Sequence, residues 1–176
     1  MKKSALLLAA AMLMTVLVSC TASDTDVPYG MQLIDDDVVD YRLYVPEDWT
    51  ESISTGAVGA YCSAEDPTNV TVMMWNDDVN ATVDDWWEGY QEDFTAVYDD
   101  FEVISTDNAT LGGLTAKRYE YTGTLASTEF HYIQYVCMRY SVSVSAVYVL
   151  TFTSTEENYE SHLEELESIV EYFEFE

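Results

Sequence analysis

The sequence predicts an α+β domain in which an antiparallel sheet of about six strands is flanked by helices on both faces. Two observations lead to this fold class. Six or seven short runs rich in β-branched and aromatic residues follow one another through the middle of the chain, and such runs between turn formers are typical of strands. Two further segments place apolar residues at three- and four-residue steps, which is the spacing of an amphipathic helix.

The expected strands are recognised by alternation and by the turns between them. Over Tyr41–Val45, the first, third and fifth side chains alternate with those of Arg42 and Tyr44. Pro46 ends that run because proline removes a ladder hydrogen bond. The pair Gly112-Gly113 separates two later runs and suits a tight turn with positive φ. The other expected strands cover residues 57–63, 70–75, 101–106, 114–121, 130–143 and 147–153. Strands that follow one another in this way favour antiparallel pairing.

The first expected helix runs from Thr82 to about Tyr98. Thr82 suits the N-cap, and Asp85 lies three residues later, where a capping box has its reciprocal acid. The apolar residues recur on one face of this helix; they are Val83, Trp86, Trp87, Tyr90, Phe94, Val97 and Tyr98. One apolar stripe indicates that the helix covers one face of the sheet.

The second expected helix runs from about Thr155 to Phe173. Ser154 and Glu157 have the spacing of a capping box. The apolar stripe follows a four-three-four-three step; it consists of Tyr159, Leu163, Leu166, Val170 and Phe173. This helix is expected to cover the opposite face of the sheet.

The first nineteen residues have the pattern of a secretory signal. Lys2 and Lys3 precede a nearly unbroken apolar run, Ala5–Val18, which is too short for a permanent membrane span. The end of the run, Leu17-Val18-Ser19-Cys20, resembles the lipobox of bacterial lipoproteins. We therefore expect cleavage before Cys20, a lipid on Cys20, and a protein held at the extracytoplasmic face of the cell membrane. Residues 20–28 are then a tether, and residues 29–176 form one globular domain.

The charge of the chain excludes one class of partner. The sequence has 33 acidic and 6 basic residues. Removal of Lys2 and Lys3 with the signal leaves four basic residues against 33 acidic ones, a net charge of −29. Such a field repels nucleic acid, so we expect no nucleic-acid binding. The same charge also leaves open an acidic surface that buffers cations without a defined site.

The order of elements resembles the PsbP-like family, which includes the Ran-binding Mog proteins and many bacterial lipoproteins. The resemblance rests on the segment Tyr41–Trp49 with its Val-Pro-x-x-Trp end, on the Gly112-Gly113 turn leading to Lys117-Arg118-Tyr119, and on the C-terminal helix. It implies a sheet with helices on both sides. It also implies an accessory or protein-binding role, because the family shares no catalytic residues. This chain is similar to the lipoprotein members.

No residue pattern of a known catalytic, cofactor or metal site occurs in the sequence. His131 and His162 stand singly, and the nucleophile, phosphate, zinc-protease and dinucleotide motifs are missing, which indicates a protein that is not an enzyme and needs no cofactor. Because the histidines and cysteines are scattered, no metal site is expected either. Acidic residues are abundant enough for chance pairs, so a hydrolase that uses carboxylates is a weaker alternative.

Two cysteines and two tryptophans are candidate site residues. Cys62 and Cys137 lie in strand-like runs; they either form a disulfide, which the chain-entropy model credits with roughly 4–5 kcal/mol, or stay buried thiols. Trp86 and Trp87 differ in direction by about 100° on a helix. We expect one of them in the core and the other at the rim, where it would line a surface for an envelope protein or a small ligand.

Overall fold

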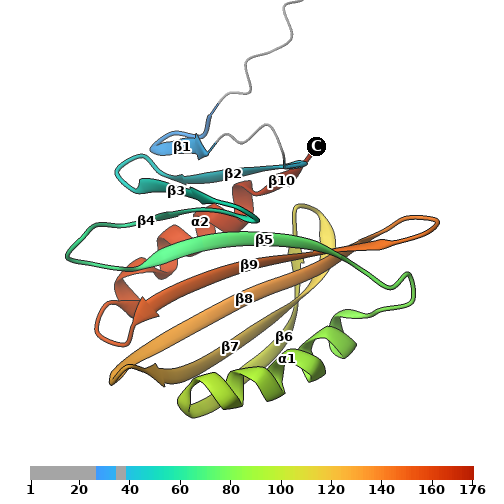
Figure 1. Ribbon diagram of the computed structural model, residues 1–176. Helices are drawn as coiled ribbons and strands as arrows, with labels where there is room; N and C mark the ends of the chain where they lie inside the picture. The colour runs from blue at the N-terminus through green and yellow to red at the C-terminus, as the bar shows by residue number, and fades with distance from the viewer. Residues whose placement is uncertain (1–26, 35–38) are drawn as a thin grey trace, which may run out of the picture.

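The computed structural model describes residues 27–34 and 39–176, which form an α+β fold with two antiparallel sheets (Figure 1). The small sheet has the order β1-β2-β10 and the large sheet the order β3-β4-β5-β9-β8-β7-β6. The strands are β1 (Met31–Ile34), β2 (Tyr41–Pro46), β3 (Thr50–Ser54), β4 (Ala57–Tyr61), β5 (Asn69–Asp77), β6 (Asp99–Leu111), β7 (Leu114–Leu125), β8 (Thr128–Tyr140), β9 (Ser145–Thr155) and β10 (Glu174–Phe175). The predicted signal segment and Cys20 lie outside the described residues.

The first helix is α1 (Val83–Val97), and its start is the one that the sequence predicts. The side chain of Thr82 accepts a hydrogen bond from the backbone of Asp85, and the Asp85 carboxylate accepts one from the backbone of Thr82. This reciprocal pair satisfies two amides that the first helical turn leaves without intrahelical partners. The predicted turn at Gly112-Gly113 is also present, with φ of 55° and 78°.

The second helical segment is shorter than predicted. It consists of a 3₁₀ turn, η1 (Tyr159–His162), and the helix α2 (Leu163–Tyr172). The capping box expected at Ser154 is wrong, because Ser154 belongs to β9 and its hydroxyl shares a hydrogen bond of 2.8 Å with that of Thr68. The side chain of Ser154, which local spacing predicted to cap the helix, is therefore hydrogen-bonded to a residue 86 positions away.

The two faces of the large sheet carry separate cores. Along β8, Tyr132 and Val136 pack in the core that includes α1, while Ile133 and Cys137 pack in the core that includes α2. This alternation follows from the two-residue repeat of a strand. In Figure 1, α1 lies in front of the strands β6 to β8, and α2 lies behind the sheet.

The predicted fold class, α+β, is confirmed, but the covering layers differ from the prediction. The core behind the sheet contains Leu43 and Val45 of β2 as well as Leu166 and Ile169 of α2, so a small sheet and a helix cover that face together. The sequence interpretation also missed β1, β3 and β10. The side chains of β3 are all exposed and β10 has two residues, so neither carries a strong strand pattern.

No helix in residues 27–34 and 39–176 has both the length and the apolar character that crossing a bilayer requires.

Candidate functional site

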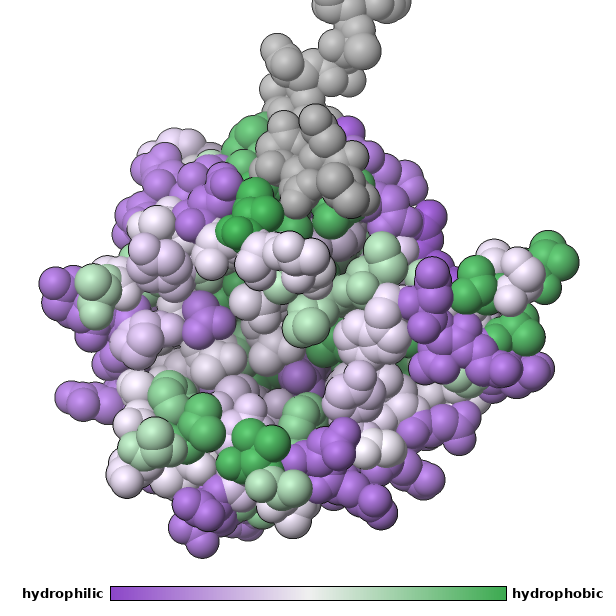
Figure 2. All heavy atoms as spheres, in the orientation of Figure 1, coloured by the Kyte–Doolittle hydropathy of each residue, from purple (hydrophilic) through white to green (hydrophobic). Residues whose placement is uncertain are grey.

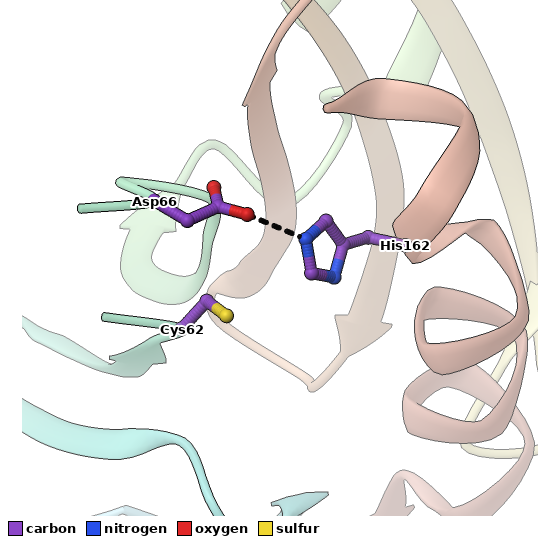
Figure 3. Close-up of side chains that lie close together, drawn as sticks. All are labelled: Cys62, Asp66 and His162. Carbon is purple, nitrogen blue, oxygen red and sulfur yellow. Dashed lines mark hydrogen bonds and ion pairs between the residues drawn. The ribbon is translucent and has the colours of Figure 1, made fainter. Parts of the chain in front are cut away.

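The fold brings together three side chains of different chemistry: Cys62, Asp66 and His162 (Figure 3). Cys62 directly follows β4, Asp66 lies in the connection from β4 to β5, and His162 ends η1. One sulfur, one carboxylate oxygen and one imidazole nitrogen lie within 4.8 Å of one another. We call these residues, together with the adjoining Glu165, the Cys62 cluster.

The connection that carries Cys62 and Asp66 is closed by its own hydrogen bonds. The amide of Cys62 donates to the carbonyl of Thr68 at 2.8 Å, and the amide of Ser63 donates to the carbonyl of Asp66 at 3.0 Å. Oδ1 of Asp66 accepts from the amide of Thr68 at 3.0 Å and from its hydroxyl at 2.7 Å. Since these donors occupy Oδ1, the second oxygen of Asp66 is directed to the imidazole.

The imidazole of His162 lies between two carboxylates. Nε2 lies 2.8 Å from Oδ2 of Asp66, and Nδ1 is hydrogen-bonded to the carboxylate of Glu165. Burial lowers the pKa of His162, but the two carboxylates outweigh burial, so that its pKa lies above the ordinary value. The buried Trp49 ring and the imidazole are nearly perpendicular, with 6.0 Å between ring centroids.

Two other members of the cluster, Asp66 and Cys62, have pKa shifts in opposite directions. Burial opposes the charged form of Asp66, but hydrogen bonds from Thr68 and His162 lower its pKa to about 2. Burial raises the pKa of the Cys62 thiol, and the charges of Asp66 and Glu165 raise it further. A catalytic cysteine needs a lowered pKa and a neighbouring base. Cys62 has neither, because both nitrogens of His162 are directed at carboxylates.

The second histidine, His131, belongs to a different arrangement, which we call the Glu120 network. Oε1 of Glu120 accepts from the hydroxyl of Tyr159 at 2.8 Å and lies 2.9 Å from Nε2 of His131. Oε2 of Glu120 lies 2.8 Å from the guanidinium of Arg118. Nδ1 of His131 lies 3.1 Å from Glu156. Both oxygens of the Glu120 carboxylate thus have partners, and the guanidinium of Arg118 compensates its charge.

Cys62 and Cys137 are free thiols, and the alternative of a disulfide between them is not realised. Cys62 follows β4 and Cys137 lies in β8, three strands further across the sheet. Three strand spacings amount to roughly 14 Å, whereas a disulfide requires α-carbons within about 7 Å. Cys137 is fully buried, and burial raises its pKa to about 12.

Trp86 and Trp87 are both buried, with exposed fractions of 5% and 9%, so the expectation that one of them lies at the rim is wrong. Trp87 stacks on Tyr119 with 4.0 Å between centroids, and Trp86 stacks on Tyr90 at 4.7 Å. The aromatic side chains of α1 and β7 therefore cover both indoles. On the face seen in Figure 2, hydrophobic side chains are scattered in small groups among hydrophilic ones. The tryptophans are core residues rather than an open aromatic surface.

The sequence interpretation missed the Cys62 cluster because His162 is 96 positions from Asp66. Only one local signal was available, namely that Cys62 lies at the end of the expected strand 57–63 and Asp66 in the turn that follows it. The prediction of no metal site assumed that histidines and cysteines are scattered. In the fold, one of each lies beside a carboxylate.

The chain has a PsbP/Mog1-like fold. No described protein family matches the sequence, and no curated protein matches it. Among solved structures, LpqN of Mycobacterium tuberculosis, which is involved in cell envelope biogenesis, matches with a TM-score of 0.61 and 15% identity, over 76% of this chain and 82% of its own. Cyanobacterial PsbP of Synechocystis matches with a TM-score of 0.62 and 14% identity, over 89% and 99%. The Ran-binding protein Mog1p of Saccharomyces cerevisiae matches with a TM-score of 0.56 and 10% identity, over 82% and 95%.

Proposed function

We propose that this chain is a bacterial lipoprotein that works as a non-catalytic accessory module of the cell envelope. Cleavage before Cys20 removes residues 1–19, and acylation of Cys20 holds the protein at the extracytoplasmic face of the cell membrane. Residues 20–28 link the lipid to the PsbP-like domain of residues 29–176. That domain contacts an envelope protein or a small ligand rather than transforming a substrate.

One agreement carries this proposal: a lipobox-like N-terminus precedes a domain whose fold is similar to that of a protein involved in cell envelope biogenesis. The segment Leu17–Cys20 follows a charged start and an apolar run, and the fold matches that of LpqN with a TM-score of 0.61. The two observations are independent, since the match in fold concerns the globular domain and the lipobox concerns the N-terminus.

The geometry of the described residues supports binding rather than catalysis. His131 and His162 each have both ring nitrogens directed at carboxylates, so neither offers a free nitrogen as a general base. The Cys62 thiol has a raised pKa, which disfavours the thiolate that covalent catalysis requires. Two proteins of similar fold also support this interpretation: LpqN is involved in cell envelope biogenesis, and Mog1p is a Ran-binding protein.

Metabolic labelling with a fatty-acid analogue tests the anchor. The wild-type chain should incorporate the label and sediment with membranes, and Cys20→Ser should lose both properties because it removes the acylated sulfur. Cys62→Ser is the matched control, since it removes a thiol that lies in the folded domain, and it should remain labelled. An unlabelled, full-length wild-type protein in the cytosol would overturn the proposal.

Cross-linking in intact cells tests the accessory role. Wild-type protein should give the same cross-linked envelope protein in repeated experiments, and Cys20→Ser should give less of it because the protein is no longer held near the membrane. Turnover of a substrate by the purified protein, lost in Glu120→Gln or Cys62→Ser, would contradict the non-catalytic assignment.

A further inference from the structure

We propose that the Cys62 cluster is a binding site for a zinc ion. The ligands are Sγ of Cys62, a carboxylate oxygen of Asp66 and Nε2 of His162, and a water molecule or a partner group completes the fourth position. Glu165 orients the imidazole through Nδ1. This site goes beyond the accessory role proposed above and does not depend on the lipid anchor.

The positions of the three ligand atoms support the proposal. Sγ of Cys62, one carboxylate oxygen of Asp66 and one ring nitrogen of His162 lie within 4.8 Å of one another. Zinc bonds of about 2.0 Å to nitrogen or oxygen and about 2.3 Å to sulfur place neighbouring ligand atoms roughly 3.3–3.8 Å apart in a tetrahedron. Nε2 of His162 and Oδ2 of Asp66 are now 2.8 Å apart, with a proton between them. A zinc ion replaces that proton when these two side chains separate by about half an ångström.

The charges around the site also favour a cation. Asp66 and Glu165 both contact His162, and within residues 27–34 and 39–176 neither carboxylate forms an ion pair with arginine or lysine. The Cys62 thiol lies beside these charges. A divalent ion compensates the carboxylates and stabilises the thiolate, because a coordinated thiol loses its proton.

Glu165 supplies the support that a metal-binding histidine requires. A ligating imidazole almost always donates its other N–H to a carboxylate or carbonyl, which sets the tautomer and the ring orientation. Nδ1 of His162 is already hydrogen-bonded to Glu165, so the ion would bind Nε2, whose present partner is the other proposed ligand, Asp66. Asp66 is held in turn by Thr68 through Oδ1, which leaves Oδ2 for coordination.

The mixture of ligands selects the kind of metal. Calcium and magnesium prefer sites made of oxygen alone, whereas thiolate and imidazole favour zinc. The three side chains come from two segments, the β4–β5 connection and the η1–α2 junction, so the ion would tie the end of the large sheet to the C-terminal helix. Cys62 is partly exposed and the side chain of Asp66 is 24% exposed, which gives the ion a path of entry.

Cobalt spectroscopy and zinc titration test the site. The full chain is purified in mild detergent, with Cys20→Ser in every variant so that the N-terminal thiol cannot bind metal. Addition of Co²⁺ should produce a thiolate-to-cobalt charge-transfer band and the visible bands of tetrahedral cobalt, and Zn²⁺ should remove them at one equivalent. Competition with a chromophoric chelator then gives the zinc affinity, measured at high salt so that the acidic surface is screened.

Matched variants locate the ligands. Cys62→Ser and His162→Gln should weaken zinc binding by about 100-fold or more, and Glu165→Gln by about 10-fold, because it removes only the orienting hydrogen bond. Cys137→Ala and His131→Gln should leave the affinity unchanged. Circular dichroism verifies that each variant is folded.

Three results would overturn the proposal. The first is a cobalt complex without a charge-transfer band in the Cys20→Ser protein, a measurement that requires no change in the folded domain. The second is zinc binding that Cys62→Ser and His162→Gln leave intact. The third is zinc binding that calcium abolishes at equal concentration, which would indicate an acidic surface without a defined site.

Discussion

The two histidines of this chain lie in similar surroundings but differ in the third group beside the imidazole and its carboxylates. His131 and His162 each lie between two carboxylates at hydrogen-bonding distance. In the Glu120 network, Arg118 binds the shared carboxylate and Tyr159 stacks on the imidazole with 3.5 Å between centroids. In the Cys62 cluster, a thiol occupies the neighbouring position and, among the described residues, no guanidinium does.

This difference separates a structural histidine from a candidate ligand. Arg118 supplies a permanent cation, so the Glu120 network is complete as it is folded. The Cys62 cluster has the same arrangement of imidazole and acids, with a soft donor atom where the network has its arginine. A histidine between carboxylates is therefore not diagnostic by itself, and the third neighbour decides its role. The following predictions test this comparison, from the largest expected effect to the smallest.

Glu120→Ala should have the largest effect on stability. It removes the acceptor of three donors, Tyr159, Arg118 and His131, and should cost about 2–4 kcal/mol, because the partners of a largely buried carboxylate lose their compensation. Glu165→Ala, the equivalent change in the Cys62 cluster, should cost less than about 1 kcal/mol without metal, because that carboxylate is partly exposed. Urea unfolding in a chelator measures both. Equal costs would show that the two arrangements do not differ in this way.

Zinc should stabilise the wild-type protein through the Cys62 cluster. At free zinc about 100 times the dissociation constant, linkage gives about 2.7 kcal/mol of added stability, which a chelator reverses. The same stabilisation should appear in His131→Gln and be missing in Cys62→Ser. Thermal unfolding with and without Zn²⁺ measures it, and stabilisation that persists in Cys62→Ser would place the ion elsewhere.

Acid should weaken the Glu120 network through Glu120 itself. Burial raises the pKa of Glu120, but hydrogen bonds from Tyr159, Arg118 and His131 outweigh burial and lower it below the ordinary value of 4.5. A carboxyl whose folded pKa is lowered stabilises the fold above its unfolded pKa, and this stabilisation is lost as the pH falls through the folded pKa. At neutral pH the free energy of unfolding should be about 1–2 kcal/mol larger for wild type than for Glu120→Gln. This difference in stability should shrink below about pH 4.5.

Urea midpoints of wild type and Glu120→Gln, taken at intervals from neutral pH down to about pH 3, follow that difference. The comparison of two variants removes the contribution of the other acidic residues, whose mutual repulsion also changes with pH. A difference that stays constant over the whole range would show that the Glu120 charge does not matter.

The smallest effect concerns thiol reactivity rather than stability. In a Cys20→Ser background, a thiol reagent should modify the partly exposed Cys62 slowly and leave the buried Cys137 unmodified until the protein unfolds. Zinc should slow the modification of Cys62 further. Mass spectrometry of the labelled protein counts the modified thiols, and recovery of a Cys62–Cys137 bridge from protein kept oxidised would contradict the strand separation described above.

The parts of the fold that sequence predicts well are those that local contacts determine. The capping box at Thr82 and the turn at Gly112-Gly113 depend on residues within four positions of one another, and both predictions are confirmed. The helix start at Ser154 was wrong because a distant hydroxyl, that of Thr68, binds the same side chain. Similar local spacings therefore gave opposite outcomes, and a long-range partner made the difference.

The candidate site could not be predicted from sequence for the same reason. Cys62 and His162 occur in segments that have no shared pattern, and only the packing of α2 behind the large sheet places them side by side. The indoles of Trp86 and Trp87 were misplaced because neighbouring rings of α1 and β7 cover both of them. The angle between two side chains on a helix does not show how many aromatic residues of the neighbouring strands can cover them.

The connection between β4 and β5 has a consequence for how chains of this fold should be compared. Its seven residues, 62–68, are closed by a hydrogen bond from the Cys62 amide to the Thr68 carbonyl, and the turn within it is held by Ser63 and Asp66. Shortening or replacing this hairpin end would delete two of the three donor atoms while leaving both cores untouched. Metal binding can thus be gained or lost in evolution while the overall structural similarity stays the same. Comparisons of chains with this fold should therefore include the length of the β4–β5 connection.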